Sequence, residues 1–149
     1  LLYGIKGPVP EKEYLVPFGQ ADVKREGADI TLVSWGPALH DCLAAAEKLA
    51  AEGKSAEVVD IRTLVPLDLE TILRSVRKTG RCVVVSQAVQ IGSFTAEIAS
   101  TIQAEAFDDL DAPVLRVGAA NGIAPQSHIL EAAFLPNADN ILAAAKSIL

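Results

Sequence analysis

The sequence predicts an α/β fold, in which a parallel sheet is covered by helices on both faces. Short apolar stretches rich in β-branched residues alternate with longer segments of helix-forming residues, and glycine or proline separates several of them. Strands that alternate with helices in this way pair in parallel, because each helix carries the chain back across the sheet. The length of 149 residues, with 50% hydrophobic and 21% charged residues, suits one compact domain.

Four stretches are predicted as strands of this sheet. The first is stopped by Gly36-Pro37, and the third contains three consecutive valines, which indicates burial on both faces. In chain order, the predicted strands are residues 30–35, 56–61, 82–86 and 113–117.

Four helices are predicted between and after the strands. Asp68, Ser93 and Asn137 each precede a helical segment and can cap its N-terminus, while Gly53 ends the first helix. The predicted helices are residues 38–52, 69–78, 94–107 and a terminal helix that follows Asn137.

Two segments are predicted to lack regular structure. Residues 1–28 hold three prolines and four glycines, which exclude a long helix and indicate an arm or linker before a domain at 29–149. Residues 118–137 are predicted to be irregular, with a turn at Asn121-Gly122. The chain begins with Leu1 and contains no Met, so we expect it to be a piece of a longer protein.

Charge and hydropathy exclude several classes of partner. The net charge of −6 argues against nucleic acid and anionic membranes, and no apolar run approaches the roughly 18 residues of a membrane span. No secretory leader is visible, so we expect the protein not to be secreted. Residues 82–149 carry only Arg116 and Lys146 against seven acids, which favours a basic protein partner at this end.

Few residues are candidates for chemistry. His40 and His128 are predicted to be structural or solvated, and no glycine-rich phosphate-binding motif occurs. Cys42 and Cys82 are predicted to be reduced thiols without metal-ligand spacing, and Arg62 is predicted to pair with a carboxylate. A further basic cluster is predicted to be a solvated helix face: Arg74, Arg77, Lys78 and Arg81. The residues alone therefore predict no catalytic, cofactor-binding or metal-binding site.

Several longer motifs carry a family resemblance. In order along the chain they are VPEKEYLVPFGQADVKREG at 9–27, DITLVSWG at 29–36, AEVVDIRTLVPLDLETILRSVRKTGR at 56–81, FTAEIASTIQAEAFDDLDAPVLRV at 94–117 and FLPNADNILAAAKSIL at 134–149. The combination of REG, DIRTL-P-D, KTGR and LDAP resembles the carboxyl-terminal half of the beta subunit of thiamine-dependent 2-oxo acid dehydrogenases, the pyruvate and branched-chain enzymes.

The resemblance implies a fold and a set of partners. It implies a three-layer α/β/α domain like the transketolase C-terminal domain, mostly parallel with one antiparallel edge strand, which ADVKREG at 21–27 can supply. It implies that thiamine diphosphate and Mg²⁺ serve the intact enzyme but bind outside this fragment, between the alpha subunit and the amino-terminal half of the beta subunit. The fragment alone is then expected to be inactive, within an enzyme of the bacterial cytoplasm or the mitochondrial matrix.

The implied role of the domain is assembly and docking. The expected partners are the alpha subunit, a second beta subunit, and the dihydrolipoyl acyltransferase core, which binds through its small basic subunit-binding domain. By the resemblance, Asp111 of LDAP and the terminal carboxylate of Leu149 face that basic domain. Small residues beside the apolar stripe of helix 94–107 suit a contact between subunits: Ala96, Ala99 and Ala106.

Two departures from the family pattern leave the substrate open. Ser86-Gln87-Ala88 replaces a usual acidic element, and Asn121 to Pro125 replaces a usual Asp-Thr-Pro-x-Pro element. Two other interpretations remain: a free-standing interaction or regulatory domain of transketolase-like fold, and a domain of a ferredoxin-linked 2-oxo acid oxidoreductase.

Overall fold

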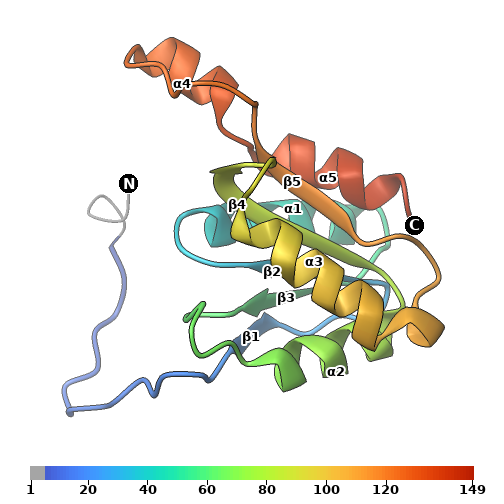
Figure 1. Cartoon of the computed structure of the whole chain (residues 1–149). Coiled ribbons are helices and arrows are strands. Elements are labelled where there is room, and N and C mark those ends of the chain that lie inside the picture. Colours follow the sequence, from blue (N-terminus) through green and yellow to red (C-terminus); the bar gives the residue numbers. More distant parts are fainter. Residues whose placement is uncertain (1–5) are drawn as a thin grey trace.

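A computed structural model describes residues 6–149 as a five-stranded sheet between two layers of helices (Figure 1). The strands are β1 (Asp22–Arg25), β2 (Ile30–Ser34), β3 (Ala56–Asp60), β4 (Cys82–Val89) and β5 (Leu115–Ala119). They are ordered β1-β3-β2-β4-β5, with β1 antiparallel to β3 and every other neighbouring pair parallel. The predicted three-layer fold with one antiparallel edge strand is confirmed.

The helices divide the hydrophobic core into two halves. The four long helices are α1 (Ala38–Ala51), α2 (Leu69–Thr79), α3 (Phe94–Glu105) and α5 (Ala138–Lys146). Helices α1 and α5 cover one face of the sheet, against Leu32 and Val58, while α2 and α3 cover the other face, against Val33 and Val59. Successive strand residues point to opposite faces, so the continuous apolar runs fill both halves of the core.

Two of the three predicted N-caps are confirmed. The Asp68 carboxylate accepts a hydrogen bond from the Thr71 N–H at 3.1 Å, and the Asn137 side chain caps α5 in a capping box. The prediction for Ser93 is wrong, because its hydroxyl accepts no backbone N–H of the first turn of α3. It hydrogen-bonds instead with the Thr95 hydroxyl and donates to the carbonyl of Gln90.

The largest difference from the predicted elements lies in residues 118–137. A short helix, α4 (His128–Phe134), occupies part of this segment, which was predicted to be irregular. None of its residues is buried, and its seven residues are fewer than the window over which an apolar helical pattern is recognised. Strand β4 also continues to Val89, beyond the predicted end at residue 86, with an irregular register against β5.

The arm has no helix or strand from residue 6 until β1 and runs away from the body of the domain (Figure 1). Residues 1–5 of the predicted arm lie outside the described residues. β1 lies inside the segment predicted as an arm, so the sheet begins before residue 29. Within residues 6–149, no helix is long and apolar enough to cross a membrane.

Candidate docking surface

The two predicted docking residues lie at the edge where the parallel strands begin. Asp111 stands between α3 and β5, and Leu149 follows α5, which runs back along the sheet to this edge (Figure 1). The two residues lie on opposite faces, because Leu110 packs against the α2/α3 half of the core and Leu149 against the α1/α5 half. We call residues 107–113, Arg81 and Leu149 the docking edge.

A turn at the end of α2 fixes the position of Asp111. The Asp111 N–H donates to the Gly80 carbonyl at 2.8 Å, and an Arg81 guanidinium nitrogen lies 3.2 Å from the Asp111 carboxylate. Gly80 has a φ of 68°, and a Cβ there would lie 2.7 Å from a carboxylate oxygen of Asp111. The motifs KTGR and LDAP therefore form one structural unit, in which the left-handed turn favours glycine and a Cβ at residue 80 would make the Asp111 side chain move.

The carboxylate of Asp111 is exposed but already has a cationic neighbour. Its side chain is 60% exposed, and Arg81 is the ion-pair partner. Asp109 is likewise paired, with the Arg77 guanidinium at 3.2 Å. Asp108 takes part in none of the ion pairs found within residues 6–149. The acidic character that the sequence predicts at this end is therefore partly neutralised by arginines from α2 and the turn after it.

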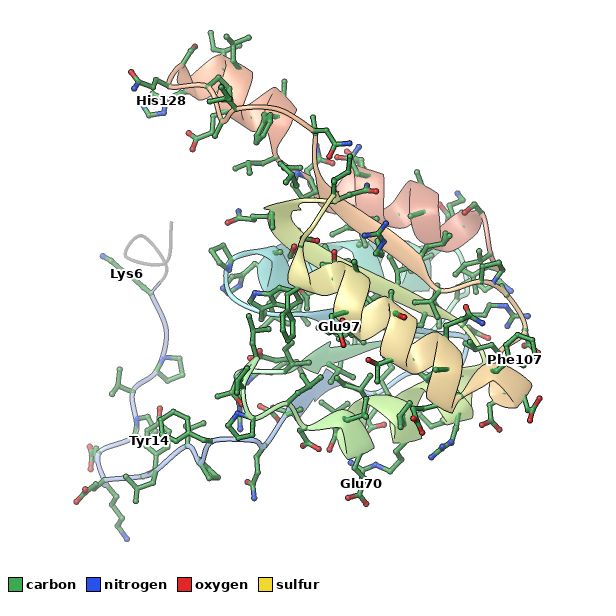
Figure 2. The ribbon with its side chains drawn as sticks, in the orientation of Figure 1. Lys6, Tyr14, Glu70, Glu97, Phe107 and His128 are labelled. Atoms are coloured by element: carbon green, nitrogen blue, oxygen red, sulfur yellow. The ribbon has the colours of Figure 1, made fainter. Side chains whose placement is uncertain are left out.

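A cleft of about 370 Å³ opens beside Asp111. Its walls are Gln103, Phe107, Asp108, Leu110, Asp111, Ala112 and Pro113. The Phe107 ring is 66% exposed and projects from the 3-10 turn Phe107–Asp109 at the outer end of the domain (Figure 2). An aromatic ring beside carboxylates suits a cationic side chain, whose aliphatic stem packs on the ring while its charge meets the acids. Sequence reasoning missed Phe107; the available signal was an aromatic residue directly before two acids at the end of a helix.

Leu149 anchors the end of the chain. Its side chain is half-buried and packs against the α1/α5 half of the core, together with Ile148. One turn earlier, Lys146 pairs with Glu52 beyond the end of α1 at 2.6 Å. These contacts hold the C-terminus at the docking edge.

The REG motif joins the start of β3 to the end of α2. The Glu57 side chain is 2% exposed, and its carboxylate accepts hydrogen bonds from the Lys78 ammonium group and, at 3.2 Å, from the Gly27 N–H. Lys78 also pairs with Glu26 at 2.8 Å. The hydrogen bond to Glu26 is the main cause of the raised pKa of Lys78, and the same contact lowers the pKa of Glu26.

Gly27 allows this arrangement because a Cβ at that position would lie 2.1 Å from the backbone nitrogen of Glu57. Three residues of the basic cluster that was predicted to be a solvated helix face form ion pairs instead: Lys78 with the buried Glu57, Arg77 with Asp109 and Arg81 with Asp111.

The DIRTL-P-D motif attaches the arm and β1 to the body. The Arg62 guanidinium pairs with Asp22 at 2.6 Å, which confirms the prediction that Arg62 meets a carboxylate. The second carboxylate oxygen of Asp68 accepts from the Ala21 N–H at 2.9 Å. Burial alone would raise the pKa of Asp68, but the N–H donors of Ala21 and Thr71 outweigh it and lower that pKa.

The remaining candidates lie apart from one another. His40 is exposed on α1, and His128 is fully exposed on α4 with Glu131 at 3.7 Å. Cys42 and Cys82 are free thiols, as predicted, and both are buried. Burial raises the pKa of the Cys42 thiol to about 12.

The described residues do not fit thiamine diphosphate with Mg²⁺. Within residues 6–149, no group of three or more His, Cys, Asp or Glu side chains could hold a metal ion. Arg62, the cation at the carboxyl ends of the strands where ligands of such sheets bind, is paired with Asp22.

Comparisons with known proteins identify the family to which this fold and these motifs belong. The sequence matches the family described as the transketolase C-terminal domain over residues 19–141. It is 45% identical over 141 residues to the pyruvate dehydrogenase E1 component subunit beta of Bacillus subtilis, covering 95% of this chain and 43% of that protein. It is 43% identical over 145 residues to the acetoin:2,6-dichlorophenolindophenol oxidoreductase subunit beta of Cupriavidus necator, covering 97% of this chain and 43% of that protein.

A solved structure has a similar fold. A split-gene transketolase, described as an inactive beta4 tetramer, superposes with a TM-score of 0.75 at 30% identity, covering 90% of this chain and 43% of that chain.

The chain belongs to the transketolase C-terminal domain family. Within it, the sequence corresponds to the C-terminal part of the E1 beta subunits of 2-oxo acid dehydrogenases, and such relatives come from bacteria and from mitochondria. The chain spans less than half the length of the relatives it matches.

Proposed function

We propose that this chain acts as the C-terminal domain of the beta subunit of a thiamine-dependent 2-oxo acid dehydrogenase, in the component that decarboxylates the substrate and passes the acyl group to lipoamide. Its own contribution is assembly with the alpha subunit and a second beta subunit, and docking onto a dihydrolipoyl acyltransferase core. The observation that carries the docking role is the cleft beside Asp111, where an exposed ring and carboxylates surround about 370 Å³. Membership in the family and similarity to E1 beta subunits support the rest.

The docking edge suits a small basic domain. A lysine or arginine of that domain would enter the cleft, pack its aliphatic stem on Phe107 and place its charge near Asp108 and Asp111. Because Arg81 already neutralises part of the Asp111 charge, the incoming cation shares a carboxylate rather than finding an unpaired one. Such a contact at an exposed rim contributes at most about 1 kcal/mol and mainly accelerates and orients the encounter.

Catalysis belongs to the parts of the enzyme outside this chain. Thiamine diphosphate supplies the carbanion chemistry of decarboxylation when it is bound there with Mg²⁺. Relatives named for pyruvate and for acetoin match this chain at 45% and 43% identity, so a domain remote from the cofactor would serve either substrate in the same way. The enzyme would work in a bacterial cytoplasm or a mitochondrial matrix.

Calorimetric titration of this chain with the isolated basic subunit-binding domain of an acyltransferase tests the docking role. Asp111→Asn should weaken binding up to about fivefold, with a larger loss at low salt than at high salt. Asp139→Asn is the matched control, because it removes an exposed acid of the same half of the chain, paired with Lys48, at the opposite end of α5. Unchanged affinity in Asp111→Asn and in a chain extended by two residues beyond Leu149 would show that docking occurs elsewhere.

A second titration tests the assignment of catalysis to other parts of the enzyme. Thiamine diphosphate with Mg²⁺ should produce no binding heat with this chain. Micromolar binding would contradict the proposed division of roles.

A further inference from the structure

An uncharged segment leads from β5 into α4. Residues 117–130 contain no Asp, Glu, Lys or Arg, and Figure 1 shows the chain leaving the sheet there and extending away from the body of the domain. The Asn121-Gly122 pair lies in this segment, at a bend of the chain, and both residues are exposed. It is the one Asn-Gly pair in the sequence. The function proposed above gives this pair no role.

The fold does not require glycine at position 122. The φ of Gly122 is outside the left-handed region, and a Cβ there would lie 3.9 Å from its nearest neighbour, a ring carbon of Phe134, which is an ordinary contact. Gly27, by contrast, is in a place where a Cβ would overlap the backbone. Alanine would therefore fit at position 122. The consequence of glycine there is chemical, because the backbone nitrogen has no neighbouring Cβ to hinder its approach to the preceding side chain.

The two groups of this pair that can react are not held in place. Among the hydrogen bonds within residues 6–149, none involves the Asn121 carboxamide or the Gly122 N–H. The other two asparagines of the chain differ in this respect. The Asn137 carboxamide accepts two backbone N–H groups in the cap of α5. The Asn140 carboxamide accepts the Asn137 N–H at 3.1 Å, and the next backbone nitrogen, that of Ile141, donates to the Asn137 carbonyl at 3.2 Å.

We propose that Asn121 is a site of spontaneous deamidation, at which the protein modifies its own backbone through a succinimide. The Gly122 nitrogen loses its proton and attacks Cγ of Asn121. The bond from Cγ to the carboxamide nitrogen then breaks, and that nitrogen leaves as ammonia with the proton. The product is a five-membered cyclic imide.

Water opens this ring at either of its two carbonyl groups. Cleavage of the bond between the ring nitrogen and Cγ gives aspartate, whereas cleavage of the bond to the main-chain carbonyl carbon gives isoaspartate, in which the main chain runs through Cγ. One water is consumed and one ammonia is released. The reaction therefore needs no oxidant, cofactor or second protein.

Either product places a carboxylate in a segment that has no formal charge. The net charge of the chain becomes one unit more negative than −6. The new charge lies where the parallel strands end, whereas Asp111 and the rest of the docking edge lie where they begin. Titration of the modified chain with the basic subunit-binding domain should therefore give the same affinity as that of the unmodified chain.

Incubation of the 149-residue chain at pH 8, followed by peptide mapping with mass spectrometry, measures conversion at each asparagine. Asn121 should convert at least about tenfold faster than Asn137 or Asn140. Chromatography should resolve an aspartate peptide and an isoaspartate peptide, and the ammonia released should equal their sum.

Gly122→Ala is the matched control, because the structure has room for its methyl group. The methyl group hinders approach of the attacking nitrogen, so conversion at Asn121 should slow at least about tenfold. Circular dichroism and Tm of this variant should match those of the wild type, which separates a change of reactivity from a change of fold.

A peptide of residues 117–126 gives the rate of the same pair without the fold. The folded chain should convert at a similar rate, since no hydrogen bond holds either reacting group. An Asn121 that stays an amide in the folded chain while the peptide converts would overturn the proposal. Equal rates at the three asparagines, or an undiminished rate in Gly122→Ala, would overturn it as well.

Discussion

Replacing Lys78 by Met should destabilise the domain far more than the same replacement of an exposed surface lysine. The ammonium group of Lys78 is the cationic partner of the Glu57 carboxylate, whose side chain is only 2% exposed. Lys78→Met keeps most of the aliphatic stem and leaves that buried carboxylate with the Gly27 N–H as its remaining donor among the hydrogen bonds of the described residues. The free energy of unfolding should therefore fall because a buried charge loses its counter-ion.

The magnitude follows from the unequal burial of the two partners. Removing one member of a fully buried pair costs about 3–5 kcal/mol, whereas an exposed pair contributes at most about 1 kcal/mol. Lys78 is 42% exposed, so water partly screens the pair and the expected loss is roughly 2–3 kcal/mol. For a chain of this size, that loss lowers Tm by roughly 5–10 °C.

Chemical and thermal unfolding at neutral pH measure this loss, with two comparisons. Lys48→Met removes the amine of an exposed pair, in which Lys48 and Asp139 are 47% and 75% exposed, and should cost no more than about 0.5 kcal/mol. In Glu57→Gln/Lys78→Met no buried charge remains, so the double variant should be more stable than the sum of the single effects predicts. Equal losses in Lys78→Met and Lys48→Met, or strict additivity in the double variant, would refute the reasoning.

Three further predictions concern other contacts of the fold. Gly27→Ala should cost about 3 kcal/mol or more in urea unfolding, since its Cβ would overlap the backbone of Glu57, while Gly7→Ala, in open space, should be neutral. Asp68→Ala should cost about 1 kcal/mol or more at pH 7, because two N–H groups lose their acceptor. The pKa of Asp68 is lower in the folded state than its unfolded value of about 3.9. Its contribution to the free energy of unfolding is therefore complete above that value and is lost as the pH falls through the lower folded pKa. Unfolding measured as a function of pH should show the free energies of the variant and the wild type converging below pH 4. Cys42 and Cys82 should resist a thiol reagent at pH 8 in the native protein and react fully in urea, because burial raises the pKa of both thiols.

The alternation of strands and helices could be predicted because burial imposes it on the sequence. The valines of β4 lie between two helical layers, and the helix after Asp68 begins where a side-chain oxygen can accept from its first turn. These signals are local, and so they are readable from neighbouring residues. Helix α4 gave no such signal, because its seven residues are too few for an apolar helical pattern to be recognised.

The docking edge was only partly predictable for a related reason. The resemblance pointed to Asp111, but the cleft depends on Phe107, which the 3-10 turn places beside Asp111. The pairing of Lys78 with Glu57 joins residues far apart in the sequence, and nothing near either residue reveals the partner. Arg77, Lys78 and Arg81, which the sequence predicts on a solvated helix face, form ion pairs with acids that only the folded chain brings near them.

Strand β2 occupies the centre of the sheet although it is the first of the parallel strands to leave the ribosome. β2 can pair with β3 as soon as β3 has been synthesised. Its other edge stays unpaired until β4 follows, where Thr31 pairs with Cys82. Closing so long a loop costs entropy before any contact forms, and an open strand edge invites pairing with other chains. A chain that ends after Thr79 should therefore aggregate, as measured by light scattering, at concentrations where the full chain remains in solution. Synthesis of the second half of the domain thus covers the open edge of β2 and prevents aggregation of the first half.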